Sequence, residues 1–229
     1  MTQKEKNSEG FTLLELLIVI TIIAILSVAL QFVLNPSETM AKSRDVRRLA
    51  DLTTLKTALG VYLTSTSTPW LDNNSNSLCV GGATPSIWYS ADQAGAGTIT
   101  DTTYPGTFLA FVQRASAAAS AAVDGTGWIP VKLSGLIGGS AISNMPVDPI
   151  NQIVINGSAL GAITNSALTY RYACRKSPLN FEIDAKLESK AYGTSGADDK
   201  GAKDGGNNAN LYEVGTDLTI LPSEASNIF

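Results

Sequence analysis

The chain has 229 residues, enough for one long helix and one domain of ordinary size. Its formal charge of −4 gives it no general attraction for nucleic acid, so we expect no direct nucleic-acid binding. It contains no histidine, which removes the usual general base and the commonest metal ligand.

A short polar stretch, residues 1–10, precedes a continuous apolar run. The run covers residues 11–34 and carries a single formal charge, Glu15. As a helix it would be about 36 Å long and apolar on every side, and roughly 20 residues suffice to cross a bilayer core. The run therefore predicts a membrane-spanning helix.

Two ordinary explanations of this run are incomplete. A cleavable secretory signal has an apolar region of about 7–15 residues, followed by a small-residue cut site. A plain anchor explains the length but gives Glu15 no role, although a carboxylate in an apolar span costs about 3 kcal/mol. Glu15 therefore indicates a function beyond anchoring.

The start of the run resembles the prepilin motif of type IV pilins and type II secretion pseudopilins, because residues 10–15 read GFTLLE and an apolar helix follows. The resemblance implies that residues 1–10 are a leader and that a prepilin peptidase cuts between Gly10 and Phe11. It also implies that the amino group of Phe11 is methylated and that Glu15 is the carboxylate used in assembly.

Cleavage would create an ammonium group at Phe11, about 6 Å along the helix axis from Glu15. In a filament core both charges are desolvated, which is tolerable only when they pair. We therefore expect Glu15 of one subunit to pair with the Phe11 amino group of a neighbour and to set the axial register.

The positive charges Lys42, Arg44, Arg47 and Arg48 follow the span, whereas the leader is neutral. Charge counting alone would place the C-terminal domain in the cytoplasm. The resemblance implies the opposite: a single pass through the inner (cytoplasmic) membrane before assembly, then a cell-surface filament with the head outside the cytoplasm.

Residues 35–66 are expected to form the second, amphipathic half of one long helix over 11–66. Either Asn35 caps a new helix with Pro36 at its first position, or the helix continues and Pro36 kinks it. Apolar residues at three- and four-residue steps predict a stripe that packs on a sheet: Leu49, Leu52, Leu55, Leu59, Tyr62 and Leu63. The nearby charged residues are expected either to contact another subunit or to form ion pairs on a solvated face: Arg44, Asp45, Arg47, Arg48 and Asp51.

Residues 67–229 are expected to form a globular head. A polar, irregular stretch after residue 66 resembles the variable αβ-loop of pilins. The Ala-rich part of residues 108–123 predicts a short helix, and Pro130 excludes the apolar segment 128–133 from a central strand. Residues 145–149 predict a turn and resemble the Pro-x-Asp-Pro element of pseudopilin-like heads.

Three strands are predicted, over residues 168–174, 180–189 and 211–217. The second alternates between Phe181, Ile183, Ala185 and Leu187 on one side and Glu182, Asp184, Lys186 and Glu188 on the other. Such alternation is typical of a sheet with one wet face. The predicted fold class is α+β, a pilin-like lollipop in which the long helix packs on a small antiparallel sheet.

Cys79 and Cys174 both lie beyond the apolar run. If this part is exported, an oxidising compartment favours a disulfide between the variable loop and the first predicted strand, and the alternative is two separate thiols. Residues 193–210 hold no large apolar side chain and predict a loop. Major pseudopilins bind calcium in such a loop, which makes Asp198, Asp199 and Asp204 candidates. Lys200 and Lys203 interrupt them, so a solvated loop is favoured and no other cofactor is expected.

The resemblance implies a structural subunit that polymerises into a type IV pilus or pilus-like filament. The alternative is a pseudopilin of a type II secretion system, and a more distant one is a membrane-anchored monomeric adhesin. The implied partners are further copies of the chain, the prepilin peptidase, an inner-membrane assembly platform and an assembly ATPase. We find no nucleophile motif or phosphate loop and expect no enzyme.

Overall fold

The computed structural model describes residues 11–92, 100–101, 110–114, 121–151, 162–164 and 166–221. Gly10 and the rest of the predicted leader lie outside the described residues. The chain divides into two compact units, Met1–Met40 and Ala41–Phe229, and each is described by itself.

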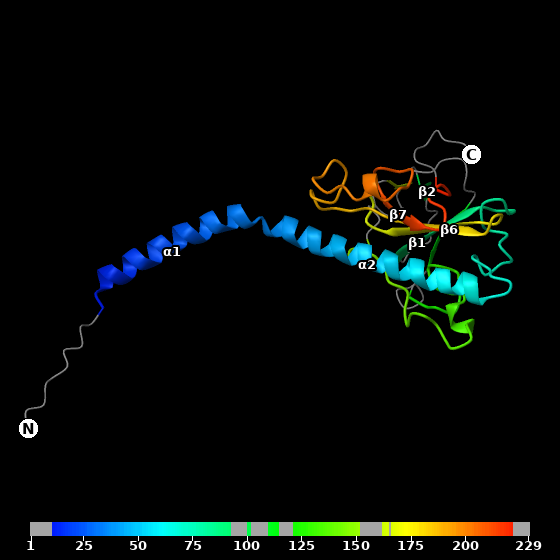
Figure 1. Ribbon diagram of the computed structural model, residues 1–229. Coiled ribbons are helices and arrows are strands. Elements are labelled where there is room, and N and C mark those ends of the chain that lie inside the picture. Colours follow the sequence, from blue (N-terminus) through cyan, green and yellow to red (C-terminus); the bar gives the residue numbers. More distant parts are fainter. Residues whose placement is uncertain are drawn as a thin grey trace, which may run out of the picture. The chain divides into compact units, whose positions relative to one another are not determined.

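The first unit contains helix α1 (Leu13–Leu34), labelled in Figure 1. Its described apolar side chains are all exposed, from Val19 at 45% to Leu13 at 81%. The stretch Leu13–Leu30 is long and apolar enough to cross a membrane. Nothing within the chain covers this surface among the residues described, so its burial must come from lipid or from other molecules.

A break separates α1 from α2 (Pro36–Ser65). Asn35 has a left-handed backbone with φ of 38°, and its carbonyl accepts hydrogen bonds from Glu38 N (3.1 Å) and Thr39 N (3.3 Å). Pro36 is the first residue of α2, where its missing N–H would have no helical partner in any case. Of the two alternatives for this region, the structure has a new helix that starts at Pro36.

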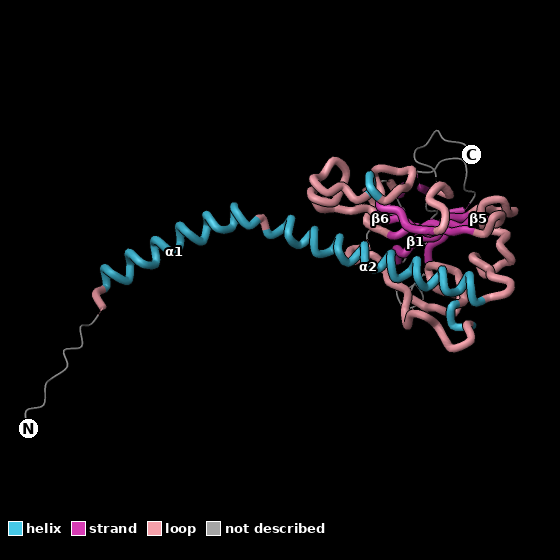
Figure 2. Tube along the Cα trace, in the orientation of Figure 1, coloured by secondary structure: helices cyan, strands magenta, loops and turns pink. Residues whose placement is uncertain are grey.

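In the second unit, α2 buries most of the predicted apolar stripe, while Leu49 at its start is only partly buried. Leu52, Leu55 and Leu59 are completely buried, Tyr62 is 7% exposed, and Leu63 packs at the margin. They share one core with side chains of the sheet, including Tyr170, Tyr172, Phe181 and Ile183. Figure 2 shows α2 lying alongside the strands. The predicted packing of an amphipathic helix on a sheet is confirmed.

The main sheet has five strands in the order β3-β1-β5-β6-β7. Their bounds are β1 Ser86–Asp92, β3 Ala110–Arg114, β5 Tyr170–Arg175, β6 Asn180–Ala185 and β7 Tyr212–Gly215. Neighbours are antiparallel except β1 and β3, which are parallel. Separately, β2 (Thr100–Asp101) pairs with β4 (Ala162–Ile163). The three predicted strands and the α+β class are confirmed, while β1 is an additional strand that the sequence did not predict.

The helix predicted over residues 108–123 is wrong where it can be compared. Residues 110–114 form β3 and pair in register with β1, for example Phe111 with Ile87. Residues 108–109 and 115–120 lie outside the described part. Pairing with β1 decides the conformation of residues 110–114, and residues 121–123, at the end of the Ala-rich part, are not helical.

The segment around Pro130 behaves as predicted. Trp128, Ile129, Val131 and Leu133 are completely buried without forming a central strand. Short 3₁₀ helices follow at Leu133–Gly135 (η1) and, in the C-terminal loop, at Gly201–Lys203 (η2).

The prediction of a wet sheet face is wrong. Glu182 and Asp184 on β6 are completely buried. The reason is a second apolar cluster on their side of the sheet, which includes Ala173, the cross-strand partner of Glu182, together with Ile220 and Leu221. The alternation identified the two faces of β6 correctly, but both faces are covered.

Candidate functional site

The N-terminal end of α1 carries the predicted assembly residues. Thr12 caps the helix: Thr12 Oγ1 accepts a hydrogen bond from Glu15 N at 3.2 Å. In return, Glu15 Oε2 accepts from Thr12 N at 2.9 Å and from Thr12 Oγ1 at 2.8 Å. This reciprocal capping box holds the carboxylate in the first turn, where the helix dipole also favours a negative charge.

The same end of the chain presents Phe11, whose side chain is 82% exposed. Glu15 is exposed as well, so both groups are available to another molecule. The structure thus places Phe11 and Glu15 together at the start of α1. Thr12 is the residue that the sequence analysis missed, although T-x-x-E is the usual signature of a capping box.

A family model described as the prokaryotic N-terminal methylation motif matches residues 6–30. This motif places the chain in the type IV pilin- and pseudopilin-like family. Proteins of this pilin-like family are typically structural, not enzymatic, and the motif implies processing by a prepilin peptidase. With α1, it indicates a membrane-anchored prepilin. Among curated proteins and solved structures, none matches the chain.

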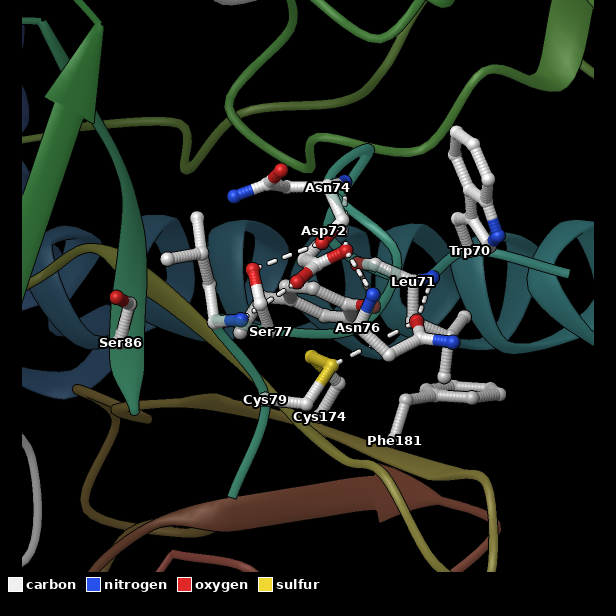
Figure 3. The surroundings of a disulfide bond; sticks show 12 residues. Trp70, Leu71, Asp72, Asn74, Asn76, Ser77, Cys79, Ser86, Cys174 and Phe181 are labelled. Atoms are coloured by element: carbon white, nitrogen blue, oxygen red, sulfur yellow. Dashed lines mark hydrogen bonds between the residues drawn. A yellow bond between two sulfur atoms is a disulfide. The ribbon is translucent and has the colours of Figure 1, made fainter. Parts of the chain in front are cut away.

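The head of this pilin-like chain contains the predicted disulfide. Cys79 and Cys174 are bonded, both are completely buried, and their Cα atoms lie 4.7 Å apart. Figure 3 shows the loop that the bond ties to β5. Asp72 orders this loop, because Oδ1 accepts from Asn74 N and Asn76 N and Oδ2 accepts from Leu78 N. The stretch predicted as irregular is therefore a hydrogen-bonded structure anchored to the sheet.

Loss of this disulfide should destabilise the head. Cys79→Ala with Cys174→Ala frees a closed loop of 95 residues in the unfolded chain, and we expect the free energy of unfolding to fall by about 2–4 kcal/mol. Urea unfolding of the full chain in detergent measures the change. Reductant should lower the midpoint of the wild type but leave that of the double variant unmoved. Equal midpoints for wild type and variant without reductant would contradict the prediction.

Of the charged residues of α2, Arg47 and Asp51 form a local ion pair, which was one of the two alternatives, whereas Arg44, Asp45 and Arg48 join a largely buried network. Arg48 is completely buried, and its guanidinium donates to both carboxylate oxygens of Asp148, at 2.6 and 3.0 Å. Arg48 also donates to Asp45 (2.8 Å) and to Glu188 (2.6 Å). Arg44 makes two further bonds to Glu188. Asp148 belongs to the predicted Pro-x-Asp-Pro element, so this element attaches the head loop to α2.

This network joins two guanidinium groups, of Arg44 and Arg48, to the carboxylates of Asp45, Asp148 and Glu188. Burial alone would lower the pKa of Arg48, but the bonds and charges of Asp148, Glu188 and Asp45 outweigh it and raise the pKa. Burial likewise tends to raise the pKa of Glu188, and the two arginines lower it. Asp45 in addition accepts from the backbone of Glu188 and Ser189 at 3.0 and 2.8 Å. The network therefore joins α2, the turn at Asp148 and the segment after β6.

The three calcium candidates are each engaged by their own loop. Asp198 pairs with Lys200 and Lys203 at 2.6 and 3.2 Å. Asp199 accepts from the backbone at Ser195 and Ala202, and Asp204 from the backbone at Gly206 and Glu213. Within the part of the chain that the structure describes, no three acidic, histidine or cysteine side chains gather to hold a metal. Calcium binding stays a prediction that this geometry does not support.

Proposed function

We propose that this protein is a structural subunit that polymerises into a type IV pilus or pilus-like filament after leader cleavage and methylation of Phe11. The observation that carries the proposal is Glu15, fixed by Thr12 at the start of a helix with no buried described side chain. An anchor alone needs neither the carboxylate nor its position next to the new amino terminus.

The proposed assembly step is an exchange of partners at Glu15. In the single chain, Oε2 is held by the N–H and hydroxyl of Thr12. Cleavage after Gly10 exposes an ammonium group at Phe11, which is the stronger partner for a carboxylate in an apolar surrounding. When α1 helices bundle, the carboxylate of one subunit binds the ammonium of its neighbour, and the apolar side chains of α1 leave lipid for each other.

The remaining partners follow from this function. The inner-membrane platform and the assembly ATPase would extract the subunit from the membrane and add it to the base of the filament. The head, joined to α2 by the Arg48 network, would then lie outside the cytoplasm as the surface of a cell-surface filament.

The second candidate is a pseudopilin of a type II secretion system, and the Asp148 element favours it. This element fastens the head to α2 as a structural part, and a similar one is found in pseudopilin-like heads. Deletion of the gene for this protein distinguishes the two candidates by the phenotype of the cells. Loss of sheared surface filaments supports the pilus, whereas loss of protein secretion with normal surface filaments supports the pseudopilin. A monomeric adhesin would leave both unchanged.

A further inference from the structure

The sheet face that carries Asp184 also holds two buried carboxyl groups, Glu182 on β6 and Glu213 on β7. They are 0% and 1% exposed. One oxygen of each is bonded to the backbone. Glu182 Oε2 accepts from Ile220 N at 2.7 Å and Leu221 N at 2.8 Å. Glu213 Oε2 accepts from Asn208 N at 3.0 Å.

The register of β6 and β7 places Glu182 opposite Gly215 and Glu213 opposite Asp184, so both carboxyl groups lie on the same face. Glu182 Oε1 and Glu213 Oε1 are buried and receive no hydrogen bond from an N–H or hydroxyl of the described residues. The two carboxyl groups are close enough for each to shift the pKa of the other. Because an ionised carboxylate has only acceptors, a hydrogen bond between the two groups forms only when one of them carries a proton.

The surrounding charges disfavour removal of that proton. Among the described residues, Asp184 on β6 raises the pKa of Glu182 and Asp204 in the loop before β7 raises that of Glu213, while the cation Arg171 on β5 is the cross-strand partner of Asp184. Arg171 donates to the Thr164 carbonyl at 2.7 Å. Burial, more than any neighbour, raises the pKa of Glu182 and raises that of Glu213 to about 7.

We propose that Glu182 and Glu213 form a proton-dependent latch that holds residues 217–221 on the sheet. With one shared proton, Glu182 keeps its bonds to the backbone of Ile220 and Leu221, whose side chains are completely buried in the second apolar cluster. When the proton leaves, two adjacent carboxylates repel each other in a closed space. The segment then loosens and exposes apolar surface.

The direction of the pH effect follows from the raised pKa values. A carboxyl group whose pKa is higher in the folded than in the unfolded chain contributes its full stabilisation when the pH is below the ordinary pKa of 4.5. That stabilisation is lost as the pH rises through about 7. Residues 217–221 are therefore held on the sheet in mild acid and released in mild base.

Hydrogen exchange of the full chain in detergent, at about pH 5.5 and about pH 8.5, tests the latch. After correction for intrinsic rates, amide protection of residues 217–221 should fall about tenfold or more at the higher pH. Glu213→Gln should make the protection nearly independent of pH, because the amide donates to Glu182 at either value. Asp198→Asn, which removes a half-exposed carboxyl from the neighbouring loop, should keep the wild-type response.

Equal corrected protection of the wild type at both pH values would overturn the latch, and so would a wild-type pH response in Glu213→Gln. The wild-type comparison needs no variant, so it decides even where a substitution prevents folding. The same exchange measurement is repeated at the higher pH with millimolar calcium. Calcium-dependent protection that Glu213→Gln abolishes would mean that the pair binds a cation in place of a proton, which also overturns the proposal.

Discussion

Glu15→Ala should abolish filaments while leaving the protein cleaved and in the membrane. The substitution leaves the Phe11 ammonium without its carboxylate in an apolar bundle, and breaking a buried ion pair in this way costs about 3–5 kcal/mol. Since about 1.4 kcal/mol is a factor of ten, we expect the yield of sheared filaments to fall at least about 100-fold. Immunoblots of sheared and cell-bound fractions measure the yield, and electron microscopy the filaments.

The matched control is Thr21→Val in the same helix. Thr21 donates its hydroxyl to the Ile18 carbonyl of its own helix, so its loss removes a polar group without touching the proposed pair. This variant should assemble normally. Glu15→Ala filaments with wild-type yield and pitch would show that the carboxylate does not set the register.

Arg48→Met should produce the largest loss of stability in the head. Arg48 is the only described cation that bonds both Asp45 and Asp148, and both carboxylates are buried. Its removal leaves them without a counter-charge, so we expect the free energy of unfolding to fall by about 3–5 kcal/mol. Thermal or urea unfolding of the full chain in detergent gives the value.

Arg47→Met is the control for this variant, one residue away on the same helix. The Arg47 side chain is 63% exposed, and its nitrogen lies 3.7 Å from Asp51. An exposed pair of this kind contributes little, so the change should stay within about 0.5 kcal/mol. Equal effects of the two substitutions would mean that the buried network does not hold α2 to the head.

The elements with a strong local pattern were predictable from the sequence. The stripe from Leu52 to Tyr62 and the alternation along β6 each have the period of their element, and both elements form as expected. The strands β1 and β3 were missed because their identity depends on pairing with partners far away in the chain. The covered face of β6 was missed for the same reason, because Ile220 and Leu221, which bond Glu182, are almost forty residues away in the chain.

The proposed assembly site was predictable for a different reason. Its residues lie within one short segment, and the peptidase and the membrane act on that segment as a linear sequence. The Arg48 network was not predictable, because the helical pattern only placed Arg48 off the apolar stripe. Its burial comes from Asp148 and Glu188, which are 100 and 140 residues away.

Mass spectrometry of the subunit from sheared surface filaments is the most direct measurement of the proposed function. The proposal predicts a mature chain that begins at Phe11 and carries one methyl group on its amino terminus. A filament subunit that begins at Met1, or one cut after the apolar run, would contradict it. So would the absence of this chain from every surface filament of cells that express it.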